Sequence, residues 1–307
     1  MSFLFSDLGT IKSYRTIEGF GVNTYVWINE KEHRVLIKYH WIPTLGVKTI
    51  DRHEAEVLAG VDPDIATRDL YDTIAKGGKV EYFLKVQVME MEESECLEFD
   101  TLYATKVWPE DKFPLIEVGK ITLNENPKNF FGEIEQIAFC PSNIVPGVAL
   151  SNDKLLQGRS FSYKDTQRYR IGANFQQLPI NKPIVEVNNN TQDGPMRYFY
   201  NKGSINYKPN TLNDNKPLEH PKGKKEPIYV EGNLVRKTID KSQDFLQAGE
   251  RYRAMTDKEK NTLISNIAAD MWEVDIRIQL KAIDNFSKAD KEFGRRLKTE
   301  LRIEEHC

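Results

Sequence analysis

The first part of the chain alternates hydrophobic and polar residues with the two-residue period of β-strands. Residues 22–29 (VNTYVWIN) and 33–40 (HRVLIKYH) both show this alternation, and only the short segment EKE separates them. Two such runs joined by a short link predict an antiparallel hairpin with one buried face. The residues predicted on one face of the first strand are Val22, Thr24, Val26 and Ile28.

The strand pattern returns further along the chain, at residues 81–90 (EYFLKVQVME) and 116–124 (IEVGKITLN). Helical spacing lies between the strand at 33–40 and the strand at 81–90, near residues 52–60 and 63–76, and another helix is predicted at 127–138. The pattern therefore predicts a sheet whose strands are separated by turns and short helices.

Residues 173–250 lose this periodicity and are rich in Asn, Pro, Gly and Lys, as in NNNTQDG and HPKGKKEP. A segment this long without secondary structure is usually functional or disordered, and wrapping around a partner subunit is one such function. The sequence TDKE at 256–259 is a capping box, which predicts that the last part of the chain is helical. We therefore divide the chain into residues 1–172, a wrapping loop at 173–250 and a helical domain at 251–307.

The overall composition is that of an ordinary globular protein. The chain has 307 residues and a formal net charge of −3, so we expect neither nucleic acid nor a membrane as a partner. The N-terminal sequence MSFLFSDLGT has an early aspartate and no basic segment before an apolar run, and no apolar stretch reaches the length of a membrane span. We expect a cytoplasmic location.

Cysteine and histidine spacing excludes two common kinds of site. The three cysteines, Cys96, Cys140 and Cys307, are far apart and show no CxxC spacing. The five histidines include no HxxxH pair. The sequence therefore indicates neither a disulfide framework nor an ordinary zinc site.

Residues 153–172 (DKLLQGRSFSYKDTQRYRIG) predict one helix, with Ser151 at its start and Gly172 at its end. One face of this helix mixes cations, hydroxyl groups and a phenol, where a core-facing helix has aliphatic residues. Spacing alone favours a plain interpretation, in which Tyr163 lies at the edge of the core and the arginines lie on the surface. The alternative is a ligand-binding face. Its residues are Leu155, Arg159, Ser162, Tyr163, Thr166 and Arg170.

The chemistry of the ligand-binding alternative depends on the arginine one turn before the tyrosine. A free phenol has a pKa of about 10, and a nearby guanidinium favours its charged form. A phenolate is a hard anionic donor that suits ferric iron. Arg170, two turns after Tyr163, lies at a distance suited to a porphyrin propionate. The face is therefore a candidate haem-docking surface.

A longer stretch of sequence carries a family resemblance. Residues 107–181 (VWPEDKFPLIEVGKITLNENPKNFFGEIEQIAFCPSNIVPGVALSNDKLLQGRSFSYKDTQRYRIGANFQQLPIN) are similar to the corresponding segment of monofunctional haem catalases. The segments GFGVNTYVWIN, VLIKYHWIPTLGVK and RDLYDTIAKG match the same family upstream, and INYKPN and NFSKADKEFGRRL match it downstream. The resemblance covers essentially the whole chain.

The resemblance implies a role for each residue of the helix face. By the family motif R-x-x-x-Y, Tyr163 is the axial ligand of the haem iron, Arg159 is its partner, and Asp153 lies behind them in a proximal relay. Many animal members have a histidine in this relay where the present chain has Asn23, so we expect an altered relay. The residues implied to bind, line or anchor the haem are Phe139, Leu155, Arg159, Ser162, Thr166 and Arg170.

The resemblance argues against a second cofactor. Members that hold NADPH use a basic or polar set of residues, and this chain matches that set at Phe3, Ser6 and Trp108. Two carboxylates near a nucleotide phosphate are unfavourable, so we do not expect NADPH to bind. The positions that depart from the set are Leu8, Glu18, Ile42 and Glu110.

The match begins in the middle of the family's sequence. The catalytic histidine and asparagine of the family lie upstream of it, so no catalytic residue is assigned in this chain, and His40 is expected to be structural. The implied fold is α+β: an antiparallel eight-stranded β-barrel with a wrapping loop and a C-terminal helical domain, assembled as a homotetramer. Residues 1–172 correspond to the second half of that barrel and the haem-ligand helix.

The implied activity is haem-dependent dismutation of hydrogen peroxide to water and oxygen. Three explanations of the upstream part stay open. The chain is a piece of a full catalase, it pairs with a separately encoded N-terminal half, or it is a haem-binding or structural remnant without activity of its own. The implied partners are hydrogen peroxide and either further copies of the chain or that N-terminal half.

Overall fold

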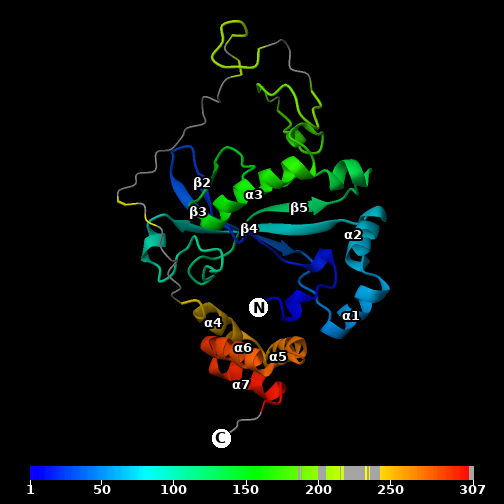
Figure 1. The fold of residues 1–307 in the computed structure, drawn as a ribbon, viewed down its shortest axis with the longest axis vertical. Coiled ribbons are helices and arrows are strands. Elements are labelled where there is room, and N and C mark those ends of the chain that lie inside the picture. The colour runs from blue at the N-terminus through cyan, green and yellow to red at the C-terminus, as the bar shows by residue number, and fades with distance from the viewer. Residues whose placement is uncertain are drawn as a thin grey trace. The chain divides into compact units, whose positions relative to one another are not determined.

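The computed structural model describes residues 1–185, 187, 189–199, 205–214, 216, 217, 232, 233, 235 and 243–303. The chain forms two compact units, whose elements are drawn in Figure 1. The first unit comprises Met1–Asn126, Pro146–Lys154 and Lys241–Cys307, and the second comprises Pro127–Val145 and Leu155–Asp240. The three-part division made from the sequence stays a prediction.

The first unit is built on an antiparallel sheet (Figure 1). Its strands are β1 Gly19–Phe20, β2 Tyr25–Ile28, β3 Arg34–Pro43, β4 Val80–Glu90, β5 Ile116–Leu123 and β6 Val148–Leu150. They lie in the order β5-β4-β3-β2-β6, and β1 also pairs with β3. The predicted hairpin is confirmed, because β2 and β3 are antiparallel with Tyr25 opposite Ile37.

The pairing register gives one face of the sheet a hydrophobic core. Val26 lies opposite Leu36, and Leu36 lies opposite Met89, so these three side chains point to the same face. Together with Trp108 and Phe113, which follow β4 in the chain, they form a buried cluster. The loop after β4 therefore covers this face of the sheet.

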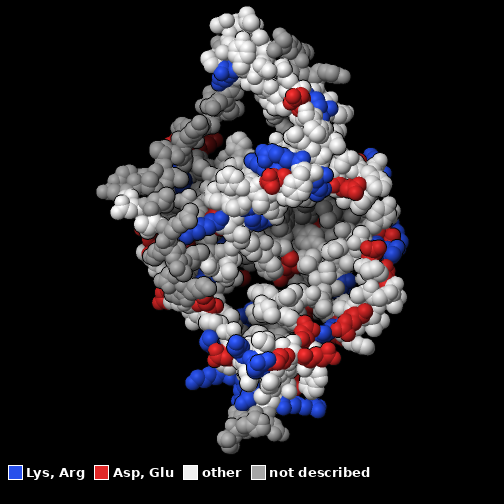
Figure 2. All heavy atoms as spheres, viewed as in Figure 1, with Lys and Arg blue, Asp and Glu red and all other residues white. Residues whose placement is uncertain are grey.

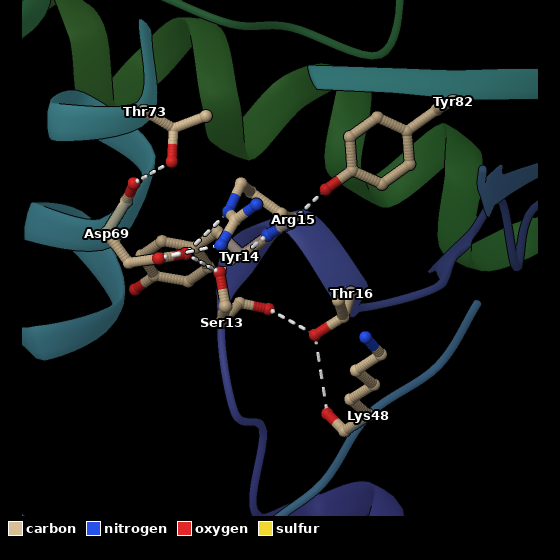
Figure 3. Close-up of polar contacts among 8 residues, drawn as sticks. All are labelled: Ser13, Tyr14, Arg15, Thr16, Lys48, Asp69, Thr73 and Tyr82. Carbon is tan, nitrogen blue, oxygen red and sulfur yellow. Dashed lines mark hydrogen bonds and ion pairs between the residues drawn. The ribbon is translucent and has the colours of Figure 1, made fainter. Parts of the chain in front are cut away.

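Two helices follow β3, and the second of them is tied to the N-terminal segment. They are α1 (Arg52–Val61) and α2 (Ile65–Ala75), close to the predicted positions. Arg15 donates from Nε and one Nη to the two carboxylate oxygens of Asp69 on α2, each at 2.7 Å (Figure 3). The Ser13 hydroxyl donates to the same carboxylate, and the hydrogen bonds from Arg15 are the main reason that the pKa of Asp69 is lowered.

The C-terminal part of the first unit is helical, as predicted. The capping box is present: the Thr256 hydroxyl accepts from the Glu259 N–H, and the Glu259 carboxylate accepts from the Thr256 N–H. The core between the helices includes Tyr252 and Phe293, whose rings stack with centroids 4.5 Å apart. Acidic and basic side chains are interspersed over the outside of these helices (Figure 2). The helices are α4 Leu246–Ala254, α5 Asp257–Met271, α6 Ile276–Ala289 and α7 Lys291–Glu300.

The second unit contains nearly all of α3 (Lys154–Arg170), which confirms the helix predicted for residues 153–172. Two backbone N–H groups after the helix, those of Ile171 and Gly172, donate to the Gln167 carbonyl at 3.0 and 3.3 Å. Gly172 has a φ of +151°, a value that glycine adopts readily. It therefore ends the helix, as its position in the sequence predicts.

The helix predicted at 127–138 is confirmed only in part. Within this range a shorter, π-helical element forms, η4 (Phe131–Glu135). The Glu133 carboxylate accepts the N–H groups of Lys128 and Asn129 at 2.6 and 3.3 Å, so these donors are satisfied outside a helix.

A short 3₁₀ helix, η5 (Phe175–Gln177), follows α3. Among the residues that the structure describes, no helix or strand lies between η5 and α4. The predicted wrapping loop, 173–250, falls partly outside the described residues, and its wrapping of another subunit stays a prediction.

Two glycines give a matched test of helix packing. A Cβ added at Gly249 in α4 would lie 2.1 Å from the Ala289 carbonyl oxygen of α6, whereas a Cβ added at Gly60 in α1 would meet nothing within 4 Å. We expect Gly249→Ala to lower the free energy of unfolding by about 1–3 kcal/mol, because the helices must separate. Gly60→Ala should raise it by about 0.5–1 kcal/mol, because alanine is the better helix former. Urea unfolding measures both, and equal effects would contradict this packing.

Candidate functional site

The arginine and tyrosine predicted to work together on α3 are in direct contact. An Nη of Arg159 donates to the Tyr163 hydroxyl oxygen at 2.7 Å, and the guanidinium carbon lies 5.0 Å from the centroid of the tyrosine ring. The two residues are one helical turn apart, so α3 itself sets this geometry. A guanidinium has only donors, so the phenol oxygen is the acceptor of a hydrogen bond from a charged group.

Most of the other residues predicted to contact haem are exposed or half-buried. Leu155 is 50% exposed and Phe139 is 70% exposed, although both have large apolar side chains. Ser162 is exposed and donates its hydroxyl to the Arg159 carbonyl at 3.3 Å, and Thr166 is half-buried. Apolar surface exposed together with a few polar groups is typical of a site that a ligand or a partner covers.

Arg170 anchors the backbone that precedes Phe139. Its guanidinium donates to the carbonyl oxygens of Glu135 at 2.8 Å and Ile137 at 2.6 Å. Asn181 holds the same segment, because its Oδ1 accepts the next backbone N–H at 2.8 Å. The sequence analysis singled out Arg170 but missed Asn181, since a lone asparagine in an irregular segment gives no periodic signal.

The two predicted relay residues of the first unit are also in contact. Asn23 Nδ2 donates to Asp153 Oδ2 at 2.8 Å, and both residues are 2% exposed. The backbone N–H of Thr24 approaches the same oxygen at 3.4 Å. The Asp153 oxygen is the acceptor in this contact, so the Asn23 amide lies with its NH₂ group toward Asp153.

A buried lysine on β3 lies near this pair, and the sequence analysis missed it. Lys38 is 5% exposed; its Nζ donates to the Lys106 carbonyl at 2.8 Å and lies 5.3 Å from the centroid of the Trp108 ring. Burial lowers the pKa of Lys38 to about 8, although the charge of the Asp153 carboxylate acts to raise it. A lysine in an alternating strand is normally exposed, so the pattern of residues does not predict its burial.

His40 is held within the sheet, as expected for a structural residue. Its Nε2 lies 3.1 Å from Gln87 Oε1, and Gln87 Nε2 donates to the carbonyl oxygens of Trp108 and Phe113. Burial is the main cause that lowers the pKa of His40. These contacts connect β3, β4 and the loop that follows β4.

In the described part of the chain, no three or more His, Cys, Asp or Glu side chains are grouped so that they could hold a metal ion. None of the described helices combines the length and hydrophobicity needed to cross a membrane. Cys96 and Cys140 are free thiols, and Cys307 lies outside the described residues.

Comparison with known protein families shows which family the chain belongs to. The sequence model described as Catalase matches residues 1–214, which is more than half of the chain. The chain belongs to the catalase family. A second model, described as Catalase-related immune-responsive, matches residues 238–301.

Relatives and solved structures agree with this assignment. Catalase-1 of Arabidopsis thaliana is 42% identical over 305 residues, and the catalase of Methanosarcina barkeri is 41% identical over 314 residues. The matches cover 98% and 99% of this chain but 61% of each relative, so the chain spans about three fifths of their length. A solved structure described as a bacterial catalase has a TM-score of 0.91 at 35% identity, covering 99% of this chain and 63% of that one. The predicted α+β catalase fold is confirmed.

The buried lysine predicts a pH dependence of stability. The pKa of Lys38 is about 8 in the folded chain against an ordinary value of 10.5, so between these values the unfolded chain binds more protons. The free energy of unfolding should therefore rise with pH across this window, by on the order of 3 kcal/mol. The Lys38→Met variant should lack this contribution to the rise in the free energy of unfolding with pH.

Urea unfolding of both proteins at several pH values from 7.5 to 10.5 measures the effect, because the difference between them removes the titration of all other groups. A difference that stays constant with pH would contradict the burial of a titrating lysine.

Proposed function

We propose that this chain binds haem through Tyr163 and takes part in the dismutation of hydrogen peroxide. The observation that carries the proposal is the 2.7 Å hydrogen bond from Arg159 to Tyr163 on a helix of a catalase-family chain. An anionic oxygen suits ferric iron, and Arg159 places a positive charge beside it. The exposed side chains of Phe139 and Leu155 supply the apolar surface that a porphyrin ring requires.

The residues around Tyr163 support the haem in different ways. Arg170 has five N–H groups, so it is able to hold the backbone before Phe139 and a propionate at the same time. Ser162 and Thr166 complete the haem-facing side of α3, and Asp153 with Asn23 forms the proximal relay. When bound, haem supplies the redox chemistry that converts two molecules of hydrogen peroxide into water and oxygen.

The proton-transfer residues of this activity are not assigned to the chain. By the family resemblance, the catalytic histidine and asparagine lie in the part of the relatives that the match does not include. The sheet supports the same view: in the described residues β5 pairs on one side, with β4, and its Ile116 and Val118 are 48% and 46% exposed. An edge strand of this kind is a template for further strands.

The active protein in this proposal contains those further strands, in the same polypeptide or in a second one. It is a homotetramer in the cytoplasm and acts on hydrogen peroxide, and residues 173–250 wrap a neighbouring subunit. The length and composition of that segment support the last point.

The charges in the corresponding part of the first unit support the expectation that NADPH does not bind. Phe3, Ser6 and Leu8 line a cavity of about 810 Å³, and the Arg251 guanidinium carbon lies 3.5 Å from the centroid of the Phe3 ring. That cation is therefore already stacked on an aromatic ring. The excess of carboxylates around the cavity repels a nucleotide phosphate. The charged residues that line it are Asp7, Lys106, Asp244, Glu250, Arg251 and Glu259.

The assignment of Tyr163 as the haem ligand predicts the effect of removing its phenol oxygen. Tyr163→Phe removes the phenol oxygen, so the variant should lose either haem retention or the optical spectrum of tyrosinate-ligated ferric haem. Tyr169→Phe is the matched control, because Tyr169 lies on the same helix and is 76% exposed. Titration of both proteins with hemin, followed by absorption spectra, makes the comparison. An unchanged spectrum in Tyr163→Phe would rule out this ligand.

No proton-transfer residue is assigned in the 307-residue chain, and we therefore expect the chain on its own to have low activity. General acid–base assistance is typically worth about 10²–10⁴ in rate, so the chain alone should evolve oxygen from peroxide at least about 100-fold more slowly than when complemented. Complementation means co-expression with a polypeptide that supplies the N-terminal strands, histidine and asparagine of a relative. Rapid oxygen evolution by the purified chain alone would contradict the claim that the proton-transfer residues lie outside the chain. Haem binding without activity, even after complementation, favours the remnant alternative.

A further inference from the structure

Two polar side chains of the second unit hold the backbone that leads to Phe139. Phe139 belongs to residues 136–147, a stretch that the structure describes completely and in which it has no helix or strand. Backbone groups in such a stretch have no regular partners, so side chains or water must satisfy them. The path of the chain before Phe139 is therefore set by the side chains that bind it.

Each of the four residues before Phe139 has one backbone group bound by Arg170 or Asn181, and we call residues 135–138 the held segment. The bound groups, in chain order, are the carbonyls of Glu135, Gln136 and Ile137 and the N–H of Ala138. Arg170 binds the first and third, at 2.8 and 2.6 Å. Asn181 binds the second and fourth, both at 2.8 Å. The two side chains thus alternate along the held segment.

Further contacts fix these two side chains to the rest of the second unit. Arg170 Nε donates to Gln167 Oε1 at 2.8 Å, and Gln167 is 8% exposed on α3. Asn181 Nδ2 also donates to the Phe175 carbonyl of η5 at 3.1 Å. The backbone N–H of Asn181 donates to the Leu178 carbonyl at 2.9 Å. The held segment is therefore tied both to α3 and to η5.

The held segment leads directly into an exposed aromatic side chain. Ala138 is 7% exposed, whereas Phe139 is 70% exposed. Beyond Phe139, the Asn143 N–H donates to the Cys140 carbonyl at 3.0 Å, so the chain turns there. An apolar side chain on a backbone fixed on both sides is preorganised for a ligand, because little conformational entropy is lost on binding.

The amide of Asn181 is suited to its task because it both donates and accepts. It serves two carbonyl groups and one N–H group of the backbone. A carboxylate lacks the donors for the carbonyls, and an aliphatic side chain lacks both kinds of group. The identity of this residue therefore controls how the held segment is bound.

We propose that Asn181 is a positioning residue of the haem-docking surface, which holds the backbone of Gln136 and Ala138 so that Phe139 is presented to the porphyrin ring. Asn181 acts through Phe139. The link to haem rests on the proposed haem function, whereas the hydrogen bonds that hold the segment do not.

A double-mutant cycle on hemin affinity tests whether Asn181 acts through Phe139. Asn181→Ala should weaken hemin binding at least about 5-fold, because the freed segment must be ordered again on binding. The same substitution made in Phe139→Ala has no aromatic side chain to place and should weaken binding less than about 2-fold. Titration with hemin, followed by absorption, compares the four proteins. Equal weakening in both backgrounds would mean that Asn181 only supports the unit as a whole, and would overturn the proposal.

Asn210 provides a matched control, because it is another asparagine of the second unit whose side chain binds backbone. It is 5% exposed; its Nδ2 donates to the Tyr207 and Lys216 carbonyls at 3.2 and 3.3 Å, and its Oδ1 accepts two backbone N–H groups. Asn181→Ala and Asn210→Ala should each lower the thermal midpoint of the hemin-free chain by roughly 2–6 °C, because each leaves backbone groups without partners. Asn210→Ala should leave hemin affinity unchanged. Equal loss of affinity in the two variants counts against a specific role of Asn181.

Hydrogen exchange in the unmodified chain tests the held segment without any variant. The Ala138 amide lies outside helices and strands, yet it donates to Asn181 Oδ1. It should exchange at least about 10-fold more slowly than the same amide in an unstructured peptide of this sequence. Exchange at the peptide rate would show that Asn181 does not hold the segment, and the proposal would fail.

The outcomes separate this role from the proposed iron ligand. If Tyr163→Phe leaves the haem spectrum unchanged while the Asn181 effect depends on Phe139, the ligand is wrong and the positioning role stands. If Tyr163→Phe changes the spectrum while Asn181→Ala acts equally in both backgrounds, the ligand stands and the positioning role is overturned.

Discussion

The hydrogen bond from Arg159 to Tyr163 is the interaction on which the functional interpretation depends. It joins a group that only donates to a phenol oxygen one helical turn away, so any distortion of α3 would separate the two. Within the first unit, hydrogen bonds fix the residues just before α3: the Ser151 hydroxyl donates to the Thr24 carbonyl and accepts the Asp153 N–H at 3.2 Å.

Much of the fold was predictable because hydrophobic periodicity and capping are local. The β2–β3 hairpin, α3 and the Thr256–Glu259 capping box follow from neighbouring residues, and the structure has all three. The helix expected at 127–138 is shorter, Phe131–Glu135, and the Glu133 carboxylate accepts the N–H groups of Lys128 and Asn129 that precede it, an effect that periodicity does not include. In the 22–29 strand, Val22 is 45% exposed although the alternation places it with buried Val26, because β2 begins only at Tyr25.

The candidate site was also predictable from the sequence only in part. The spacing of Arg159 and Tyr163 is visible in the sequence, whereas their meaning as a haem site came from the family resemblance. Lys38 was not predictable, because its burial depends on the loop that carries Lys106 and Trp108, far away in the chain. The contact of Asn23 with Asp153 also joins distant residues, and the family motif anticipated it where local pattern did not.

The most direct test of the account is resonance Raman spectroscopy of the hemin-loaded chain, prepared once with ordinary tyrosine and once with ring-deuterated tyrosine. Excitation in a tyrosinate-to-iron charge-transfer band enhances the vibrations of a phenolate that is bound to iron. We predict such bands, a shift of their frequencies on deuteration, and their loss in Tyr163→Phe. Haem binding without deuterium-sensitive phenolate bands would contradict the claim that Tyr163 ligates the iron.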